Sequence, residues 1–125
     1  MDNIFSNIPT GDLFGIKTDQ GFDYQEAAKF LSMNKKAVAK AAGVSEQSVR
    51  YDERMPTDLK EFFMELVSVL SVVSSQLGED KDKTRLWFNM PNPMLGGVSP
   101  MNMILLGKHK KLMKFIQRSI SGEMP

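Results

Sequence analysis

Trp87-Phe88-Asn89-Met90-Pro91-Asn92-Pro93-Met94-Leu95-Gly96-Gly97-Val98-Ser99-Pro100 is the stretch that decides how this chain folds. Its prolines lack a backbone donor and fix φ, and its paired glycines adopt torsions that other residues resist, so neither a helix nor a strand can run through it. Its aromatic and aliphatic side chains nevertheless favour burial. The stretch is therefore predicted to form an ordered, packed loop from about Met90 to Ser99, between two helices.

Helical patterns flank this loop on its C-terminal side. Ser99 and Pro100 fit the N-cap and first position of a short helix, and Gly107 fits the position just after its end. The following segment, 108–120, alternates lysines with aliphatic residues at helical spacing. It is predicted to be an amphipathic helix whose cationic face either is simply solvated or binds an acidic partner.

The order of these features carries a family resemblance. A Trp (Trp87) leads into Asn-Pro-x-Leu-Gly-Gly-x-Ser-Pro (92–100), followed by an aliphatic half-turn ending in Gly107, a basic helix and a late Gly122. Over roughly residues 59–122, about half the chain, this series resembles the C-terminal toxin-binding domain of MbcA/ParS/Xre-type antitoxins. Taken singly, each residue also has a packing role: Trp87 as a core anchor, the glycines as turn formers, and Pro100 as a helix starter.

The resemblance implies a partner and a set of contact residues. The partner would be a toxin of the RES-domain type, which in this family acts on NAD, by hydrolysis or by ADP-ribose transfer. The carboxylates of Glu123 and the C-terminus could take a phosphate-like position in such a toxin. The candidate toxin-binding residues are Trp87, Asn92, Pro93, Leu95, Gly96, Gly97, Pro100, Lys110, Lys111, Lys114, Gly122 and Glu123.

Composition limits the other functions. The 125 residues suffice for one compact domain or two very small ones. With one His, no Cys and no glycine-rich phosphate loop, no familiar catalytic, zinc or nucleotide motif is present, so we expect no enzyme, cofactor or metal. The chain has no leader-like start and no apolar run near the roughly 20 residues of a bilayer span, which predicts a cytoplasmic protein without membrane contact.

The N-terminal half contains a helix-turn-helix pattern. Residues 1–22 lack any hydrophobic period and are predicted to be a loose arm. Asp23 and Asn34 fit N-caps of two helices, and Gly43 followed by Ser45 indicates a tight turn into a further helix. Residues 23–56 are therefore predicted to form a DNA-binding region.

The helix after this turn, Glu46–Tyr51, is the candidate recognition helix. Arg can pair bidentately with guanine and Gln with adenine, while a lysine on the preceding helix can contact phosphates. The competing interpretation is a helical scaffold that does not touch DNA. The candidate DNA-binding residues are Lys36, Ser45, Gln47, Ser48, Arg50 and Tyr51.

A long helix should join the two halves. From Thr57 to Leu77 apolar residues recur at helical spacing, and Gly78 follows. The predicted fold is thus all-α, with residues 57–125 as the toxin-binding and oligomerisation domain. We expect an antitoxin that neutralises its toxin and binds operator DNA, as a homodimer and within a larger toxin–antitoxin complex, because one recognition helix makes too few contacts. The alternative is a stand-alone helix-turn-helix regulator with a C-terminal dimerisation domain.

Overall fold

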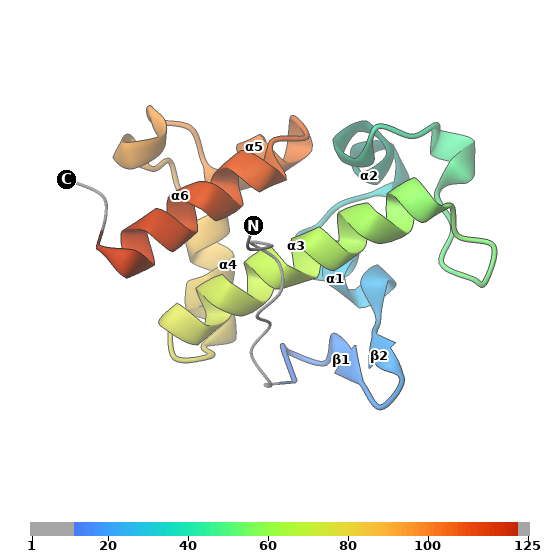
Figure 1. The fold of residues 1–125 in the computed structure, drawn as a ribbon, viewed down its shortest axis with the longest axis horizontal. Helices are drawn as coiled ribbons and strands as arrows, with labels where there is room; N and C mark the ends of the chain where they lie inside the picture. Colours follow the sequence, from blue (N-terminus) through green and yellow to red (C-terminus); the bar gives the residue numbers. More distant parts are fainter. Residues whose placement is uncertain (1–11, 123–125) are drawn as a thin grey trace.

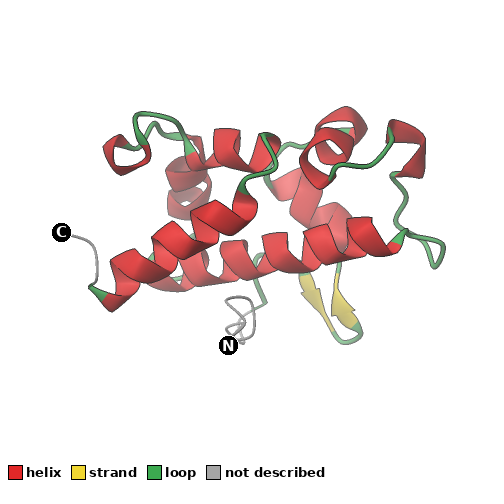
Figure 2. Cartoon of the chain, turned by 45° about the horizontal axis from the view of Figure 1, so that its top comes forward, coloured by secondary structure: helices red, strands yellow, loops and turns green. Residues whose placement is uncertain are grey.

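Helices dominate the part of the chain that the structure, a computed structural model, describes: residues 12–122 (Figure 1). The predicted all-α fold is confirmed, with one addition, a two-residue-per-strand antiparallel hairpin that projects from the helical body (Figure 2). The elements in order are β1 Lys17–Thr18, β2 Gly21–Phe22, α1 Tyr24–Phe30, α2 Lys35–Ala42, the 3₁₀ turn η1 Glu46–Ser48, α3 Thr57–Gln76, α4 Lys81–Asn89, the 3₁₀ turn η2 Pro93–Leu95, α5 Pro100–Leu105 and α6 His109–Ser121.

The long helix α3 is the spine of the molecule. It contacts α1 and α2 from the N-terminal half and α4 and α6 from the C-terminal half, so both halves of the chain share one core (Figure 1). Residues 66–71 are buried without interruption, which a helix surrounded on all sides requires. The apolar stripe predicted over 57–77 is therefore covered within the chain itself, with Leu77 half-buried at its end. Met64, which is not part of the stripe, is exposed.

The predicted helix starts are confirmed by their caps. The side chains of Asp23, Asn34 and Ser99 accept hydrogen bonds from the backbone nitrogens three residues on, at 3.1, 2.8 and 3.1 Å. Each bond satisfies one backbone donor that a helix otherwise leaves free. Gly43 adopts the left-handed conformation, φ 74°, that the tight turn after α2 needs.

The loose arm predicted for residues 1–22 is wrong in its described part. Ile16 is only 1% exposed, and the ring of Phe14 stacks on that of Phe30 at a centroid distance of 5.2 Å. Leu13 and Phe14 both have positive φ, so a tight turn, not a regular helix or strand, brings these side chains onto the core. A search for hydrophobic periodicity cannot detect such a turn. Residues 1–11 lie outside the described residues.

The predicted recognition helix is also wrong. Between Gly43 and the start of α3, the helical structure is limited to the three residues Glu46–Ser48. Val49 is already extended and buried. Ser45 caps no backbone nitrogen; its Oγ lies 2.7 Å from the Oγ of Ser48. Local side-chain bonds of this kind compete with helix formation, and the chain runs on as a loop to Pro56.

No single helix among residues 12–122 is long and apolar enough to cross a membrane.

Candidate functional site

The loop between α4 and α5 is held by one residue. The backbone of Asn92 donates to the carbonyl of Val98 and accepts from Gly97, both at 3.0 Å, while its side-chain oxygen accepts from the Met94 nitrogen at 2.9 Å. Gly96 and Gly97 have φ values of 75° and 87°, which side chains rarely adopt. The ordered Pro/Gly loop is therefore confirmed, and its closed hydrogen bonding leaves the side chains near its tip free to face outward.

A groove of about 900 Å³ lies between this loop, α5 and α6. Its apolar side is unusually exposed for large side chains, with Met94 at 55% and Leu106 at 59%. Its other side is cationic, and no carboxylate of residues 12–122 lines it. The lining consists of Met94, Leu95, Val98, Met103, Leu106 and Phe115 with Lys108, Lys111, Lys114 and Arg118.

The cationic side follows from the sequence of α6. Lys111, Lys114 and Arg118 are three and four residues apart, which places them on one face of a helix. The opposite face buries Leu112, Met113 and Ile116 against the core. Within residues 12–122, none of the groove's four cations forms an ion pair, so their charge faces solvent.

A smaller hollow of about 340 Å³ lies beside the groove and shares Phe115 with it. Trp87 and Asn92 form part of its wall, together with Ile120 near the end of α6. Trp87 is half-buried and meets the ring of Phe88 edge-on at 5.1 Å, whereas Phe88 is 0% exposed. The fully buried anchor of this module is thus Phe88, while Trp87 packs against the core and is only partly covered.

The candidate toxin-binding residues divide by position. Leu95, Lys111 and Lys114 line the groove, and Trp87 and Asn92 line the smaller hollow. Four of the remaining candidates serve the local structure: Pro93, Gly96 and Gly97 shape the loop, and Pro100 is buried at the start of α5. The Nζ of Lys110 lies 3.8 Å from a carboxylate oxygen of Glu65, away from the groove. Gly122 ends α6, and Glu123 lies outside the described residues.

Other groove residues were not among the sequence candidates. Phe115, Leu106 and Val98 look like ordinary core residues in the sequence, and only the structure shows that they border open space. Lys108 and Arg118 belong to the cationic helix face that the sequence predicted, although neither was among the candidate toxin-binding residues. Met94 and Met103 complete the missed set.

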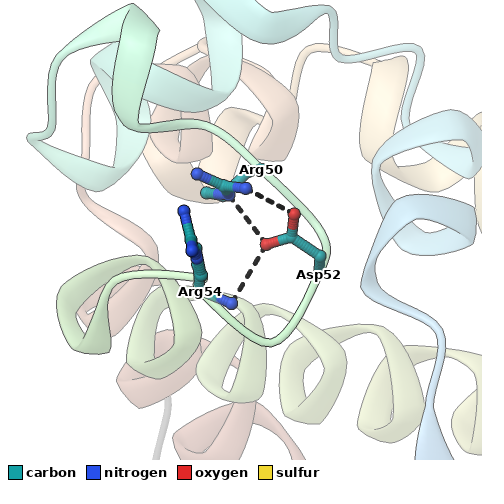
Figure 3. Close-up of polar contacts among 3 residues, drawn as sticks. All are labelled: Arg50, Asp52 and Arg54. Atoms are coloured by element: carbon teal, nitrogen blue, oxygen red, sulfur yellow. Dashed lines mark hydrogen bonds and ion pairs between the residues drawn. The ribbon is translucent and has the colours of Figure 1, made fainter.

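In the N-terminal half, Arg50 is already paired. Its Nε and Nη2 donate to the two carboxylate oxygens of Asp52 at 2.7 and 2.6 Å, and the Arg54 backbone nitrogen donates to the same carboxylate at 3.0 Å (Figure 3). The side-chain hydrogen bonding between Arg50 and Asp52 lowers the pKa of Asp52 and raises that of Arg50. A guanine contact by Arg50 would therefore have to replace an existing bidentate pair.

The other DNA candidates are also scattered. Gln47 and Lys36 are exposed, but on different elements. Tyr51 is half-buried with its ring 5.6 Å from that of Phe63, and burial raises its pKa. Lys29, Lys35 and Arg50 do meet around one shallow depression of about 580 Å³, which Asp52 shares.

Residues 75–107 match the family model of the antitoxin Xre/MbcA/ParS C-terminal toxin-binding domain. The resemblance seen in the sequence is thus confirmed over the end of α3, α4, the loop and α5, while α6 and its cations lie beyond the match. A chain of the crystal structure of the M. tuberculosis MbcT–MbcA toxin–antitoxin complex has a similar fold, with a TM-score of 0.52 and 18% sequence identity over 82% of this chain and 95% of that one. No curated protein matches this chain.

Proposed function

We propose that this protein is the antitoxin of a type II toxin–antitoxin pair and that its C-terminal half binds the toxin. The observation that carries the proposal is the coincidence of the family match, residues 75–107, with the Asn92-centred loop and its exposed apolar side chains. Exposed apolar side chains gathered beside a groove are typical of protein interfaces. A regulator that used this half only to dimerise would not need the Trp87–Pro100 series.

The proposed toxin is of the RES-domain type and acts on NAD. A pocket that binds a pyrophosphate should be electropositive, and the residues after α6 include the carboxylate of Glu123. We propose that residues 122–125 reach the toxin's active-site mouth, while the loop and α6 supply most of the contact. Whether the toxin hydrolyses NAD or transfers ADP-ribose does not affect this arrangement.

The test is co-expression with a RES-like protein encoded beside this chain. The full-length chain should restore growth that the toxin arrests, and the two proteins should co-purify. A variant lacking Gly122–Pro125 should still co-purify but should restore growth poorly. If the full-length chain neither restores growth nor co-purifies, the antitoxin assignment fails; if the truncated chain restores growth fully, only the role of the tail fails.

Binding to operator DNA, as a dimer, is the second part of the proposal. The observation in its favour is the exposed row of lysines on α2 together with Lys29 and Arg50 at the neighbouring depression. Since the recognition helix is absent, the contact would come from α2 and the η1 turn, and phosphates would supply most of it. Titration of the chain's own upstream DNA at several salt concentrations tests this, with light scattering to determine the number of subunits.

A further inference from the structure

The groove combines an exposed apolar side with a cationic side. One side presents Met94, Val98 and Leu106, all more than a third exposed, and the other presents four cations. Methionine side chains adapt their shape to a partner, and Met94 and Met103 both line the groove. The lining therefore fits a ligand that is apolar on one face and anionic on the adjacent face.

The length of the cationic side sets the size of the ligand. Lys108 and Arg118 lie ten residues apart along α6, and a helix rises 1.5 Å per residue, so the row is about 15 Å long. Its members recur every three or four residues. A second helix of about three turns has the same length and can present one carboxylate per turn to this row.

We propose that the groove binds an acidic amphipathic helix of the toxin, with its apolar face against Leu106, Val98 and Phe115 and its carboxylates toward Lys111, Lys114 and Arg118. This inference rests on the proposed antitoxin function, because the helix is assigned to the toxin. In helix-in-groove binding the ligand helix places apolar anchors at helical spacing into an apolar groove, and complementary charge beside the groove fixes its orientation. Nucleic acid is a poorer fit, since its charged backbone would leave the apolar lining uncovered.

The experiment uses the full-length chain and two synthetic peptides of about 14 residues, each with Leu on one helical face. One peptide carries Glu at positions i, i+3 and i+7 beside that face, and the other carries Lys at the same positions; circular dichroism confirms equal helicity. Fluorescence anisotropy should show that the Glu peptide binds and that added salt weakens it, whereas the Lys peptide should bind at least about tenfold more weakly.

Variants of the chain locate the binding. Lys111→Glu/Lys114→Glu should reverse the preference between the two peptides, and Leu106→Asp should abolish binding of both. Lys81→Glu/Lys83→Glu changes the same net charge at exposed positions of α4 away from the groove and should leave the preference unchanged. Thermal melting shows that each variant folds; if Leu106→Asp does not, Val98→Asp replaces it.

Several results would overturn the proposal. These are equal affinity for the two peptides, no binding of the Glu peptide at millimolar concentration, and the same effect from the α4 control variant. Tighter binding of duplex DNA or of phosphatidylserine vesicles, lost in Lys111→Glu/Lys114→Glu, would assign the groove to those ligands instead. The co-expression test remains separate: growth restored equally by the native chain and by this variant leaves the antitoxin function intact and refutes the groove, whereas charge-selective peptide binding without growth rescue refutes the toxin assignment.

Discussion

The two halves of the chain differ in how many of their surface side chains already have partners within the chain. Around residues 45–54, Arg50 pairs with Asp52 and Ser45 bonds to Ser48. Around residues 92–118, the backbone of the loop is closed on itself, while Met94, Leu106 and the α6 cations face solvent. Two stretches with similar Gly and Ser punctuation thus differ in what they leave available to a partner, and the C-terminal one leaves far more.

Substitution of the two adjacent aromatic residues of α4 should give the largest change in stability. Phe88 is fully buried, so Phe88→Ala should lower the free energy of unfolding by about 3–5 kcal/mol. Trp87→Ala, at a half-buried position that borders the hollow, should cost clearly less stability but weaken toxin co-purification. Urea unfolding of the two variants measures the first quantity. Equal destabilisation would show that Trp87 belongs to the core and not to the binding surface.

The sequence predicted the C-terminal half well because its signals are local. Ser99, Pro100, Gly96 and Gly107 each fix the backbone near themselves, and α3 has a strong period. The prediction of a recognition helix was wrong because the helix is ended by side-chain pairs, such as Arg50 with Asp52, and hydrophobic periodicity carries no signal of such pairs. The sequence candidates include only part of the groove lining, because whether Leu106 or Phe115 is covered depends on where α5 and α6 pack.

DNA binding tests whether the Arg50–Asp52 pair keeps the N-terminal half from contacting a partner. If Arg50 reads a base, Arg50→Ala should cost about 1–3 kcal/mol of operator affinity at particular base pairs. Lys36→Ala should instead weaken all sequences similarly and reduce the salt slope by about one. Fluorescence anisotropy with operator and scrambled duplexes measures both.

Asp52→Asn provides the matched control for that experiment, because it releases Arg50 and also removes a negative charge. A gain in affinity that disappears in the Arg50→Ala background would show that the pair holds Arg50 back from DNA. A gain that persists there would come from charge alone. Absence of any salt-sensitive complex would mean that this half is a scaffold.

The loop should depend on Asn92 to a smaller degree. Asn92→Ala removes the hydrogen bond to the Met94 nitrogen and should lower the free energy of unfolding by about 1 kcal/mol, the usual loss for a capping side chain. Asn92→Asp retains the acceptor and should behave like the native chain. Chemical denaturation measures this, and amide exchange of the Met94 nitrogen locates it. Unchanged exchange in Asn92→Ala would show that the backbone bonds to Gly97 and Val98 suffice to hold the loop.

The smallest effect concerns pH. The Arg50 hydrogen bond lowers the pKa of Asp52 below that of an ordinary aspartate, so in the folded state this carboxylate stays ionised to lower pH than in the unfolded chain. Its contribution to stability is therefore complete above the ordinary carboxylate pKa and is lost as pH falls through the folded-state value. Because the pair is exposed, solvent and salt screen it, and the effect on unfolding should be slight. Carbon-detected NMR titration should place the Asp52 pKa below that of an ordinary aspartate, and Arg50→Ala should move it upward. A pKa that Arg50→Ala leaves unchanged would show that the guanidinium is not bound to Asp52 in solution, and Arg50 would then be as available to a partner as the cations of α6.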